Sequence, residues 1–331
     1  MPNVQKEIAT IVVSWNNEDI LGECFQSLRD QTIADKNITV LVDNNSADAS
    51  VDFTKINFPE VDVLDFDKNL GFAAGNNRAI EYVFKNYPTV DYIVLLNSDA
   101  RIDRNWLETL YEFAGKKKKG AFFQSITLDY YDHEVIDSSH IYVARNSAGT
   151  QSNWRSLYTG ELGPARVFGV NFAAAMINVR FIKEQPLPHL LDETMFMYLE
   201  DVDACARATV MGWENYLVPG TRAYHMGSVS SNKRPGFSLY LTYRNNIALL
   251  LKNVPSSLLL RIIPAMIRSD YHTMRHLRRI GQQGSIKYLL KGRIAGFFRL
   301  WRYRKQIKAM SPYRNSVAKE YIWALMDKGV L

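Results

Sequence analysis

The chain has few cysteines and no long apolar run, and each absence excludes a class of protein. Only Cys24 and Cys205 occur among the 331 residues, and neither stands at the spacing of a metal ligand or a redox pair. We therefore expect two reduced thiols. The most apolar stretch near the C-terminus is interrupted by Arg261, Pro264 and Arg268, so it falls short of the ~20 apolar residues that span a bilayer. The sequence predicts a chain that does not cross a membrane.

The beginning of the chain lacks the pattern of a secretion signal. Residues 1–6 are polar and lead directly into the apolar run Ile8–Val13, which leaves no room for a charged start followed by an apolar segment. Internal repeats are missing too, and the stretch Lys116–Lys119 is typical of a solvated loop. An apolar content of 47% is ample for a globular core. We expect a cytoplasmic, globular protein.

Acidic residues are nearly absent from one region. Between Leu251 and Lys308 there are 14 basic residues and one acid, Asp270, which leaves 26 basic and 33 acidic residues elsewhere. The formal net charge of the whole chain is +6, whereas the chain outside this region carries −7. The basic character therefore belongs to one region near the C-terminus.

Apolar residues in this basic region recur at helical spacing. Five of them would share one face of a helix: Ile286, Leu290, Ile294, Phe297 and Trp301. A helix that lies on an anionic membrane has this pattern of apolar and basic faces. A helix packed on the rest of the protein has it too, and Gly292 and Gly296 favour that alternative because each weakens a free-standing helix by about 1 kcal/mol.

A basic region can also bind nucleic acid, so the alternative from another class is a nucleic-acid-binding protein that uses its C-terminal region. Here the basic residues accompany an apolar face that includes Phe297, Phe298 and Trp301, and no base-reading motif occurs. His272 and His276 are four residues apart, but no third ligand lies nearby, which predicts surface residues rather than a metal site. We expect no nucleic-acid partner.

Strand-length apolar runs alternate with helix-length patterns through the first hundred residues. This alternation predicts an α/β fold with a mostly parallel sheet and helices on both faces. The expected strands are Ile8–Ser14, Ile38–Val42, Val61–Phe66 and Tyr92–Leu96. We expect Asp103 to cap a helix over Asn105–Phe113. From residue 121 to 178 the pattern shortens and alternates, which predicts an antiparallel extension, and after about Pro235 it becomes helical.

Polar side chains stand where predicted strands end, at the edge where open α/β sheets bind ligands. Asp99 follows an apolar strand and can bind a hard cation that bridges two phosphate oxygens. Asp43 can accept the ring N–H of uracil or thymine, or it can form an Asx turn before Asn44. His225 follows a predicted strand and a turn at Pro219–Gly220, so it can return to the same edge as a nitrogen ligand.

Two neighbouring acids, Glu200 and Asp201, begin a predicted helix. Neighbouring helical side chains point about 100° apart, so one acid can act as a base while the other orients it. Both can instead be acids that favour the helix dipole, which is the interpretation we give to Asp203. Gly71 and Gly75 lack the third glycine or the Lys-Ser/Thr of known phosphate loops, so we expect them to let the backbone approach a nucleotide.

The order of these motifs resembles the glycosyltransferases of family 2 with GT-A fold, and most of all their rhamnosyltransferase-like branch. The resemblance covers about residues 7–250. It is carried by Val42–Ser46, Asn69–Asn77, Asn97–Asp99, the pair Glu200 and Asp201, and His225. One departure is Asn97, where aspartate is commoner, so Asp99 is the only acid in that motif.

The resemblance implies a Rossmann-like mixed sheet with a C-terminal helical extension. Residues 1–234 would form the catalytic domain, with a nucleotide-sugar half over about 1–115 and an acceptor half over about 116–234. Residues 235–331 would form the basic helical region. The residues expected to bind the nucleotide sugar are Ser14, Trp15, Asn16, Asp43, Asn69, Gly71, Asn77, Asn97, Ser98 and Asp99.

The resemblance also implies transfer of a sugar with inversion, with Asp201 as the base and Glu200 as its orienting partner. Asp99 and His225 would bind a divalent cation, Mn²⁺ or Mg²⁺, and a nitrogen ligand favours Mn²⁺. The implied donor is dTDP-β-L-rhamnose, with UDP-galactofuranose or UDP-N-acetylhexosamine as alternatives. The implied acceptor is a lipid-linked or surface glycan, which would place the enzyme on the inner face of the cell membrane.

Overall fold

The computed structural model describes residues 5–144, 149–160, 162–227 and 236–316. Its strands are β1 (Ile8–Ser14), β2 (Asn37–Asp43), β3 (Asp62–Asp65), β4 (Tyr92–Asn97), β5 (Ala100–Ile102), β6 (Gly120–Asp129), β7 (Ile136–Ser138), β8 (Ile141–Val143), β9 (Gly149–Gln151), β10 (Ala165–Val167), β11 (Ala174–Asn178) and β12 (Glu214–His225). Its α-helices are α1 (Glu18–Arg29), α2 (Ser50–Asn57), α3 (Gly71–Asn86), α4 (Trp106–Gly115), α5 (Val179–Glu184), α6 (Glu200–Val210), α7 (Phe237–Asn253), α8 (Ser256–Arg279), α9 (Ile286–Phe298) and α10 (Leu300–Ser316).

The large sheet is parallel in its N-terminal part and mixed beyond it. β3, β2, β1 and β4 lie side by side and run parallel, which confirms the four predicted strands to within one residue at each end. The register pairs Ser14 with Asp43 and Val13 with Asn97, so the polar residues after these strands share one edge. β7, β10 and β11 are antiparallel to their neighbours, as predicted, while β12 runs parallel to β6.

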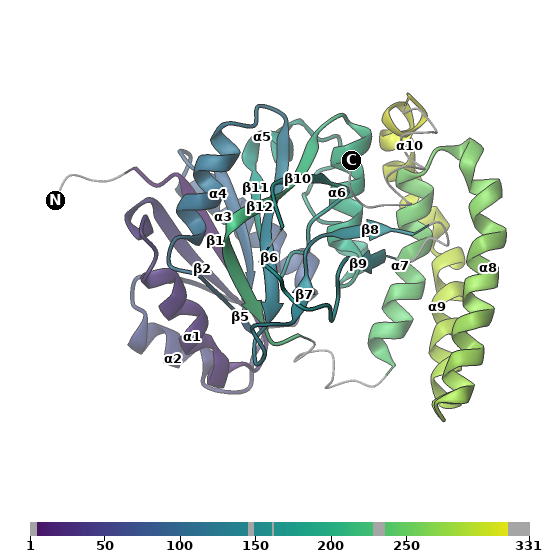
Figure 1. The fold of residues 1–331 in the computed structure, drawn as a ribbon, viewed down its shortest axis with the longest axis horizontal. Coiled ribbons are helices and arrows are strands. Elements are labelled where there is room, and N and C mark those ends of the chain that lie inside the picture. Colours follow the sequence, from purple (N-terminus) through teal and green to yellow (C-terminus); the bar gives the residue numbers. More distant parts are fainter. Residues whose placement is uncertain (1–4, 145–148, 161, 228–235, 317–331) are drawn as a thin grey trace.

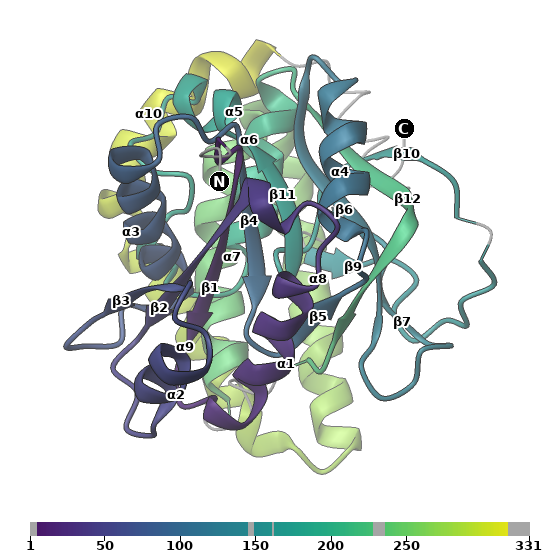
Figure 2. The same cartoon turned by 90° about the vertical axis from the view of Figure 1, so that its left-hand side faces the viewer.

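Helices cover both faces of the sheet (Figures 1 and 2). The side chains of β1 alternate between the two faces, as a strand requires. Ile8 and Val12 pack with α1, α2 and α4, whereas Ala9 and Ile11 pack with α3, α5 and α6. This double covering is the α/β arrangement that the sequence predicts.

The C-terminal helices form a further layer outside α6 (Figure 1). An apolar cluster joins Val202 of α6 to Ile247 of α7 and Ile262 of α8. α9 packs closely on α7 at Gly292. A Cβ atom on this residue would lie 2.5 Å from the Tyr240 carbonyl oxygen, so only glycine fits there. The inner faces of these helices are thus packed on the protein. No helix within the described ranges is both long and apolar enough to cross a membrane.

The start of α4 differs from the prediction. The residue before the helix is Asn105, and it makes no side-chain capping bond. Asp103 does not cap the helix; its carboxylate accepts a hydrogen bond from the Tyr224 hydroxyl at 3.0 Å. A tertiary partner on β12 therefore replaces the expected local cap.

The predicted turn at Pro219–Gly220 is also wrong, because β12 continues through it to His225. The register of β12 against β6 shifts between Leu217 and Arg222. Gly220 has φ +89° within this irregular stretch, a conformation that glycine adopts without strain. The strand itself, rather than a turn after it, carries His225 to the edge of the sheet.

Candidate active site

One cavity of about 450 Å³ opens where β1 and β4 end. This volume lies within the ~300–1,000 Å³ that is usual for small-molecule sites. Its walls come from the ends of β1, β4 and β12 and from the starts of α3 and α6. Ten residues predicted from the sequence line it: Ser14, Trp15, Asn69, Gly71, Asn97, Ser98, Asp99, Glu200, Asp201 and His225.

Ser14, the last residue of β1, is one of the residues that line this cavity. Its Oγ is buried and makes no hydrogen bond with any residue that the structure describes. Nearby, Asn17 Nδ2 donates to Ser98 Oγ at 2.9 Å and fixes the turn after β4. Because a buried hydroxyl without a partner is costly, Ser14 Oγ is suited to bind a polar group of a ligand.

Asp99 and His225 meet across the pairing of β5 with β12. The register places His225 opposite Ala100, and its Nε2 lies 3.4 Å from Oδ1 of Asp99. On the other side of the ring, Oδ2 of Asp137 lies 3.0 Å from Nδ1. A carboxylate in this position orients an imidazole so that its second nitrogen can bind a metal.

This pair fits a divalent cation. Two adjacent ligands of one octahedral ion, each at about 2.1 Å, lie about 3 Å apart, close to the Asp99–His225 spacing. No group of three or more His, Cys, Asp and Glu side chains in the described residues is arranged to hold a metal ion, so phosphate oxygens and water would complete the coordination. Burial opposes a charge on His225, but hydrogen bonds to Asp137 and Asp99 outweigh it and raise its pKa to about 10. A bound cation would replace that proton.

Glu200 and Asp201 begin α6, and the pKa of each carboxyl is raised. Burial and the neighbouring charge of Asp201 raise the pKa of Glu200 to about 8. Burial also raises the pKa of Asp201, to about 6, against hydrogen bonds from backbone amides that include Val202 N at 2.7 Å. The pair titrates together, and the more strongly raised pKa of Glu200 favours the proton on Glu200 and leaves Asp201 as the better proton acceptor.

Asn69 and Gly71 bring the start of α3 against the loop that precedes α6. Asn69 Oδ1 accepts a hydrogen bond from Gly71 N at 2.9 Å. Gly71 has φ +80°, and a Cβ atom there would lie 2.5 Å from the Phe196 ring. Asn44 binds the same segment, with Nδ2 3.3 Å from the Gly71 carbonyl oxygen. Glycine is therefore required for this close approach.

Asn16, Asp43 and Asn77 lie outside the set of described residues that line the cavity. Asp43 accepts hydrogen bonds from Ser46 N at 2.8 Å and Ser46 Oγ at 2.6 Å, which is the Asx-turn alternative. Asn77 binds both the N–H and the carbonyl of Leu191. Asn16 adopts φ +55° in the turn after β1. These side chains hold loops around the site, and their contact with a nucleotide stays a prediction.

Some residues of the site, in the cavity wall or behind it, were not expected from the sequence. Asp137 lies in a three-residue strand without any strand-end or turn signal, and its place beside His225 follows from the pairing of β7 with β6. β9 contributes Gly149–Gln151, and α7 contributes Phe237 and Thr242. The sequence of β9 shows only a short alternating pattern, and α7 falls in the region assigned to the basic helical extension. Neither pattern predicts which residues line the cavity.

The comparisons with known sequences agree on one family. The model of Glycosyl transferase family 2 matches residues 10–179. The chain is 30% identical over 185 residues to glycosyltransferase GlyA of Streptococcus pneumoniae serotype 4, which covers 48% of this chain and 25% of that protein. It is 22% identical over 226 residues to rhamnosyltransferase WbbL of Escherichia coli K12, covering 65% of this chain and 81% of that one. The chain thus spans a quarter of the length of GlyA.

Solved structures show the same fold. GalNAc-T7 with UDP, GalNAc and Mn²⁺ superposes with a TM-score of 0.59 at 14% identity, over 75% of this chain and 48% of that one. Mannosyltransferase PcManGT from Pyrobaculum calidifontis, with GDP-Man and Mn²⁺, superposes with a TM-score of 0.52 at 14% identity, over 95% and 88% of the two chains. These likenesses confirm the predicted GT-A fold. Since the family model matches more than half of its length, the chain belongs to glycosyl transferase family 2.

Proposed function

We propose that the protein is a metal-dependent, inverting glycosyltransferase in which Asp201 is the base. The observation that carries this proposal is that Asp201, Glu200, Asp99 and His225 line one cavity. Asp201 would take the proton of an acceptor hydroxyl, whose oxygen bonds to the anomeric carbon as the bond from that carbon to the diphosphate oxygen breaks. Attack from the side opposite the diphosphate inverts the configuration. A positioned base typically contributes about 10²–10⁴-fold in rate.

The other residues of the site have supporting roles. Glu200 would donate a hydrogen bond toward the acceptor or a neighbouring loop, because its buried Oε2 has no hydrogen-bond partner among the described residues. A divalent cation bound by Asp99 and His225 would neutralise charge on the departing diphosphate. The nitrogen ligand favours Mn²⁺, and the structures of GalNAc-T7 and PcManGT that include Mn²⁺ support this choice.

The donor we propose is dTDP-β-L-rhamnose, and the product is an α-rhamnoside. The similarity to WbbL over 81% of its length supports this donor. UDP-galactofuranose and UDP-N-acetylhexosamine are the alternatives. Incubation of the protein with each nucleotide sugar and Mn²⁺, followed by measurement of the nucleoside diphosphate released, tests the choice. We expect the fastest release from dTDP-rhamnose, whereas release from none of the panel contradicts the proposal.

The acceptor we propose is a lipid-linked glycan at the inner face of the membrane, because the outward faces of α8 and α9 are apolar. We call the following exposed residues the outer face: Leu260, Ile263, Ile267 and Tyr271 on α8, Leu290, Ile294, Phe297 and Phe298 on α9, and Trp301 on α10. On α8 the spacing of three or four residues places them opposite the buried Leu258, Ile262 and Met266. An apolar face left exposed in this way marks an interaction surface.

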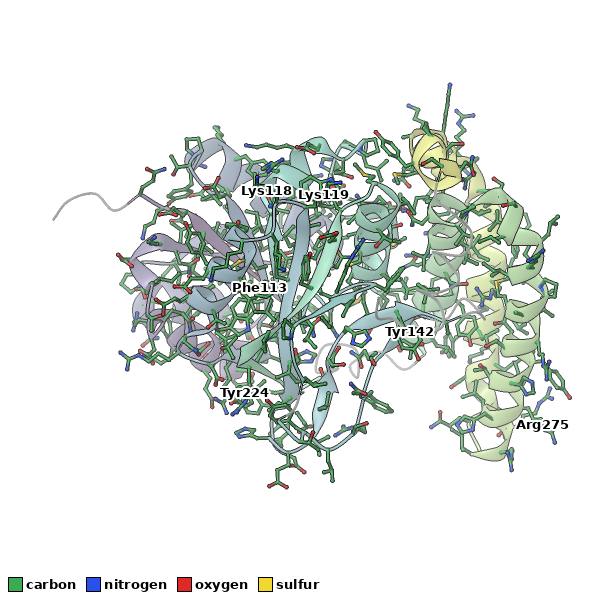
Figure 3. All side chains as sticks on the ribbon, turned by 45° about the horizontal axis from the view of Figure 1, so that its top comes forward. Phe113, Lys118, Lys119, Tyr142, Tyr224 and Arg275 are labelled. Carbon is green, nitrogen blue, oxygen red and sulfur yellow. The ribbon has the colours of Figure 1, made fainter. Side chains whose placement is uncertain are left out.

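Basic residues flank the outer face and complement an anionic surface. Lys252 and Arg293 form ion pairs with acids inside the protein, which leaves 12 of the 14 basic residues of this region. Arg261, Arg268 and Arg275 follow one another at seven-residue intervals along α8, and Figure 3 shows Arg275 at its outer edge. An apolar stripe bordered by arginine is typical of a helix at a membrane interface. The sequence left two interpretations of these helices, binding to a membrane or packing on the protein, and the helices have both a buried face and an exposed apolar face.

A further inference from the structure

The chain enters α6 through a turn with an uncommon backbone. Phe196, Tyr198 and Leu199 have φ of 65°, 70° and 67°, in the left-handed region that residues other than glycine seldom adopt. At Phe196, where ψ is −61°, the Met197 N–H donates to the Met195 carbonyl at 2.8 Å and closes the strained form of the γ-turn. Backbone strain of this kind persists only where the surrounding structure holds it.

Two side chains of α7 hold the carbonyl groups of this turn. Nδ2 of Asn245 lies 3.0, 2.9 and 2.8 Å from the carbonyl oxygens of Met195, Met197 and Tyr198. Arg244 donates from Nη2 to the Met195 oxygen at 2.6 Å and from Nε to Oδ1 of Asn245 at 2.8 Å. Because Nε must donate to an oxygen, Arg244 turns the NH₂ group of Asn245 toward the turn. Both side chains are buried, and Asn245 is fully enclosed.

The same turn also contacts the nucleotide side of the site. Ala73 N donates to the Phe196 carbonyl at 3.0 Å, and the Phe196 ring lies against Gly71. The turn therefore lies between α3 and α7, and it leads directly into Glu200 and Asp201. Its backbone angles set where these two carboxylates point.

α7 holds the first turn of α6 as well. Asn253 Nδ2 donates to Oδ1 of Asp203 at 2.8 Å, and Lys252 Nζ lies 2.9 Å from the same atom. All three side chains are buried, so these bonds are shielded from water. α7 thus binds the chain on both sides of Asp201: Asn245 binds the turn that precedes Asp201, and Asn253 binds Asp203, which follows it.

We propose that Asn245, oriented by Arg244, is a positioning residue that fixes the direction of the Asp201 carboxylate. This inference rests on the proposed role of Asp201 as the base. Without the Asn245 amide, three inward-facing carbonyl oxygens lose a shared donor, and the turn can relax toward negative φ. Asp201 then moves relative to the acceptor, and a displacement of about 1 Å can lower a rate about 10²-fold.

The test compares Asn245→Ala with Asn246→Ala. Asn246 is the next residue of α7 and is also buried, but its Oδ1 accepts from Arg293 Nη1 on α9 at 2.6 Å and not from the turn. Backbone hydrogen exchange is measured over residues 195–203 and over β4 as a reference, and dTDP binding with Mn²⁺ is measured by calorimetry. We expect exchange over 195–203 to rise about tenfold in Asn245→Ala alone. Donor hydrolysis should fall about 10²-fold in kcat with dTDP affinity kept within about threefold.

Equal exchange over 195–203 in all three proteins overturns the proposal, and so does an equal rise in both variants. An unchanged kcat with faster exchange in Asn245→Ala overturns the catalytic role. If Asn245→Ala does not fold, Arg244→Lys removes the Nε donor while keeping the charge, and it should give a smaller change in the same direction. A parent protein that hydrolyses no donor overturns the proposed function, while hydrogen exchange still decides whether Asn245 holds the turn.

Discussion

Glu200 and Asp201 are neighbours in the sequence, yet burial raises the pKa of Glu200 to about 8 and that of Asp201 to about 6. If Asp201 is the base, kcat should rise with pH as this carboxyl loses its proton, and the midpoint of that rise should lie near pH 6. We call this rise the acidic limb of the pH profile. An exposed aspartate would place that limb near pH 4. Glu200→Gln should keep the limb, because glutamine imitates a protonated glutamate. Measurement of kcat from about pH 4.5 to pH 8 decides this, and a limb lost in Glu200→Gln would assign the base to Glu200.

At the metal site, removal of one ligand should weaken diphosphate binding in particular. Asp99→Ala should abolish stimulation by Mn²⁺ and weaken dTDP binding more than thymidine binding, since the lost interaction is with phosphate. His225→Ala should act in the same direction but less. Asp137→Asn should weaken Mn²⁺ binding about 10- to 100-fold by releasing the ring. Calorimetry with and without Mn²⁺ measures each effect, and equal dTDP affinity in the parent under both conditions would exclude a metal role.

The individual residues differ in how far the sequence reveals them. Asp99 and His225 can be found because each follows a predicted strand, and strands that run in the same direction end at one edge of the sheet. Asp137 cannot, because its position depends on the pairing of a three-residue strand with β6. Lys252 is one of the 14 basic residues of the C-terminal region, but it is fully buried between Asp192 and Asp203. Its partners are 60 and 49 residues away, so no local pattern indicates them.

Among the elements, α7 shows most clearly what local patterns leave out. Its residues fall in the region that the sequence assigns to a basic helical extension, and its mixed composition predicts only a helix. In the structure it packs on α6, binds the turn before Asp201 and lines the cavity at Phe237. The parallel strands could be predicted because each one is an apolar run of strand length that is bounded by polar or turn-forming residues. The contacts of α7 could not, since they join residues 47 to 50 positions apart.

The contact of α9 with α7 gives a prediction about stability. Gly292→Ala places a Cβ atom 2.5 Å from the Tyr240 carbonyl oxygen, so the helices must separate. We expect a loss of about 1–3 kcal/mol in the free energy of unfolding, as for other overpacked sites. Gly115→Ala is the control, because no atom lies within 4 Å of a Cβ at that position of α4. Urea denaturation compares the two, and equal stability of both variants would contradict this packing.

In the whole molecule, the basic residues that cluster near the C-terminus of the sequence also cluster in space, on the C-terminal helices. Apart from Lys252 on α7, the basic residues of this region lie on α8, α9 and α10 or next to them, at the end of the molecule away from α1 and α2 (Figure 1). Each basic residue near an anionic membrane contributes about 1 kcal/mol, and buried apolar surface adds about 25 cal/mol per Å². The negative charge of the rest of the chain opposes binding only weakly, because repulsion decays within about 8 Å at physiological salt.

Removal of the outer-face aromatics should release the protein from anionic vesicles. The variant replaces Phe297, Phe298 and Trp301 with serine, and these residues are 52%, 79% and 64% exposed, so folding should not suffer. The matched control replaces three other exposed apolar residues with serine: Ile56, Tyr131 and Leu157. Co-sedimentation with anionic vesicles at physiological salt should pellet the parent and the control but not the variant.

Either of two results would contradict the membrane proposal. One is a parent protein that stays in the supernatant, and the other is a variant that pellets as well as the control. Competition with duplex DNA separates the remaining alternative, because a nucleic-acid-binding region would leave the vesicles for DNA and would not need the aromatic residues.

The central claim, that Asp201 is the base of a sugar transfer, is tested most directly by one comparison of Asp201→Asn with the parent protein. Both are incubated with the panel of nucleotide sugars and Mn²⁺, and nucleoside diphosphate release is measured alongside dTDP binding. We predict release from one donor by the parent and at least about 10²-fold slower release by Asp201→Asn, with equal dTDP affinity, because asparagine keeps the shape but cannot accept the proton. Comparable turnover by the two proteins would contradict the account.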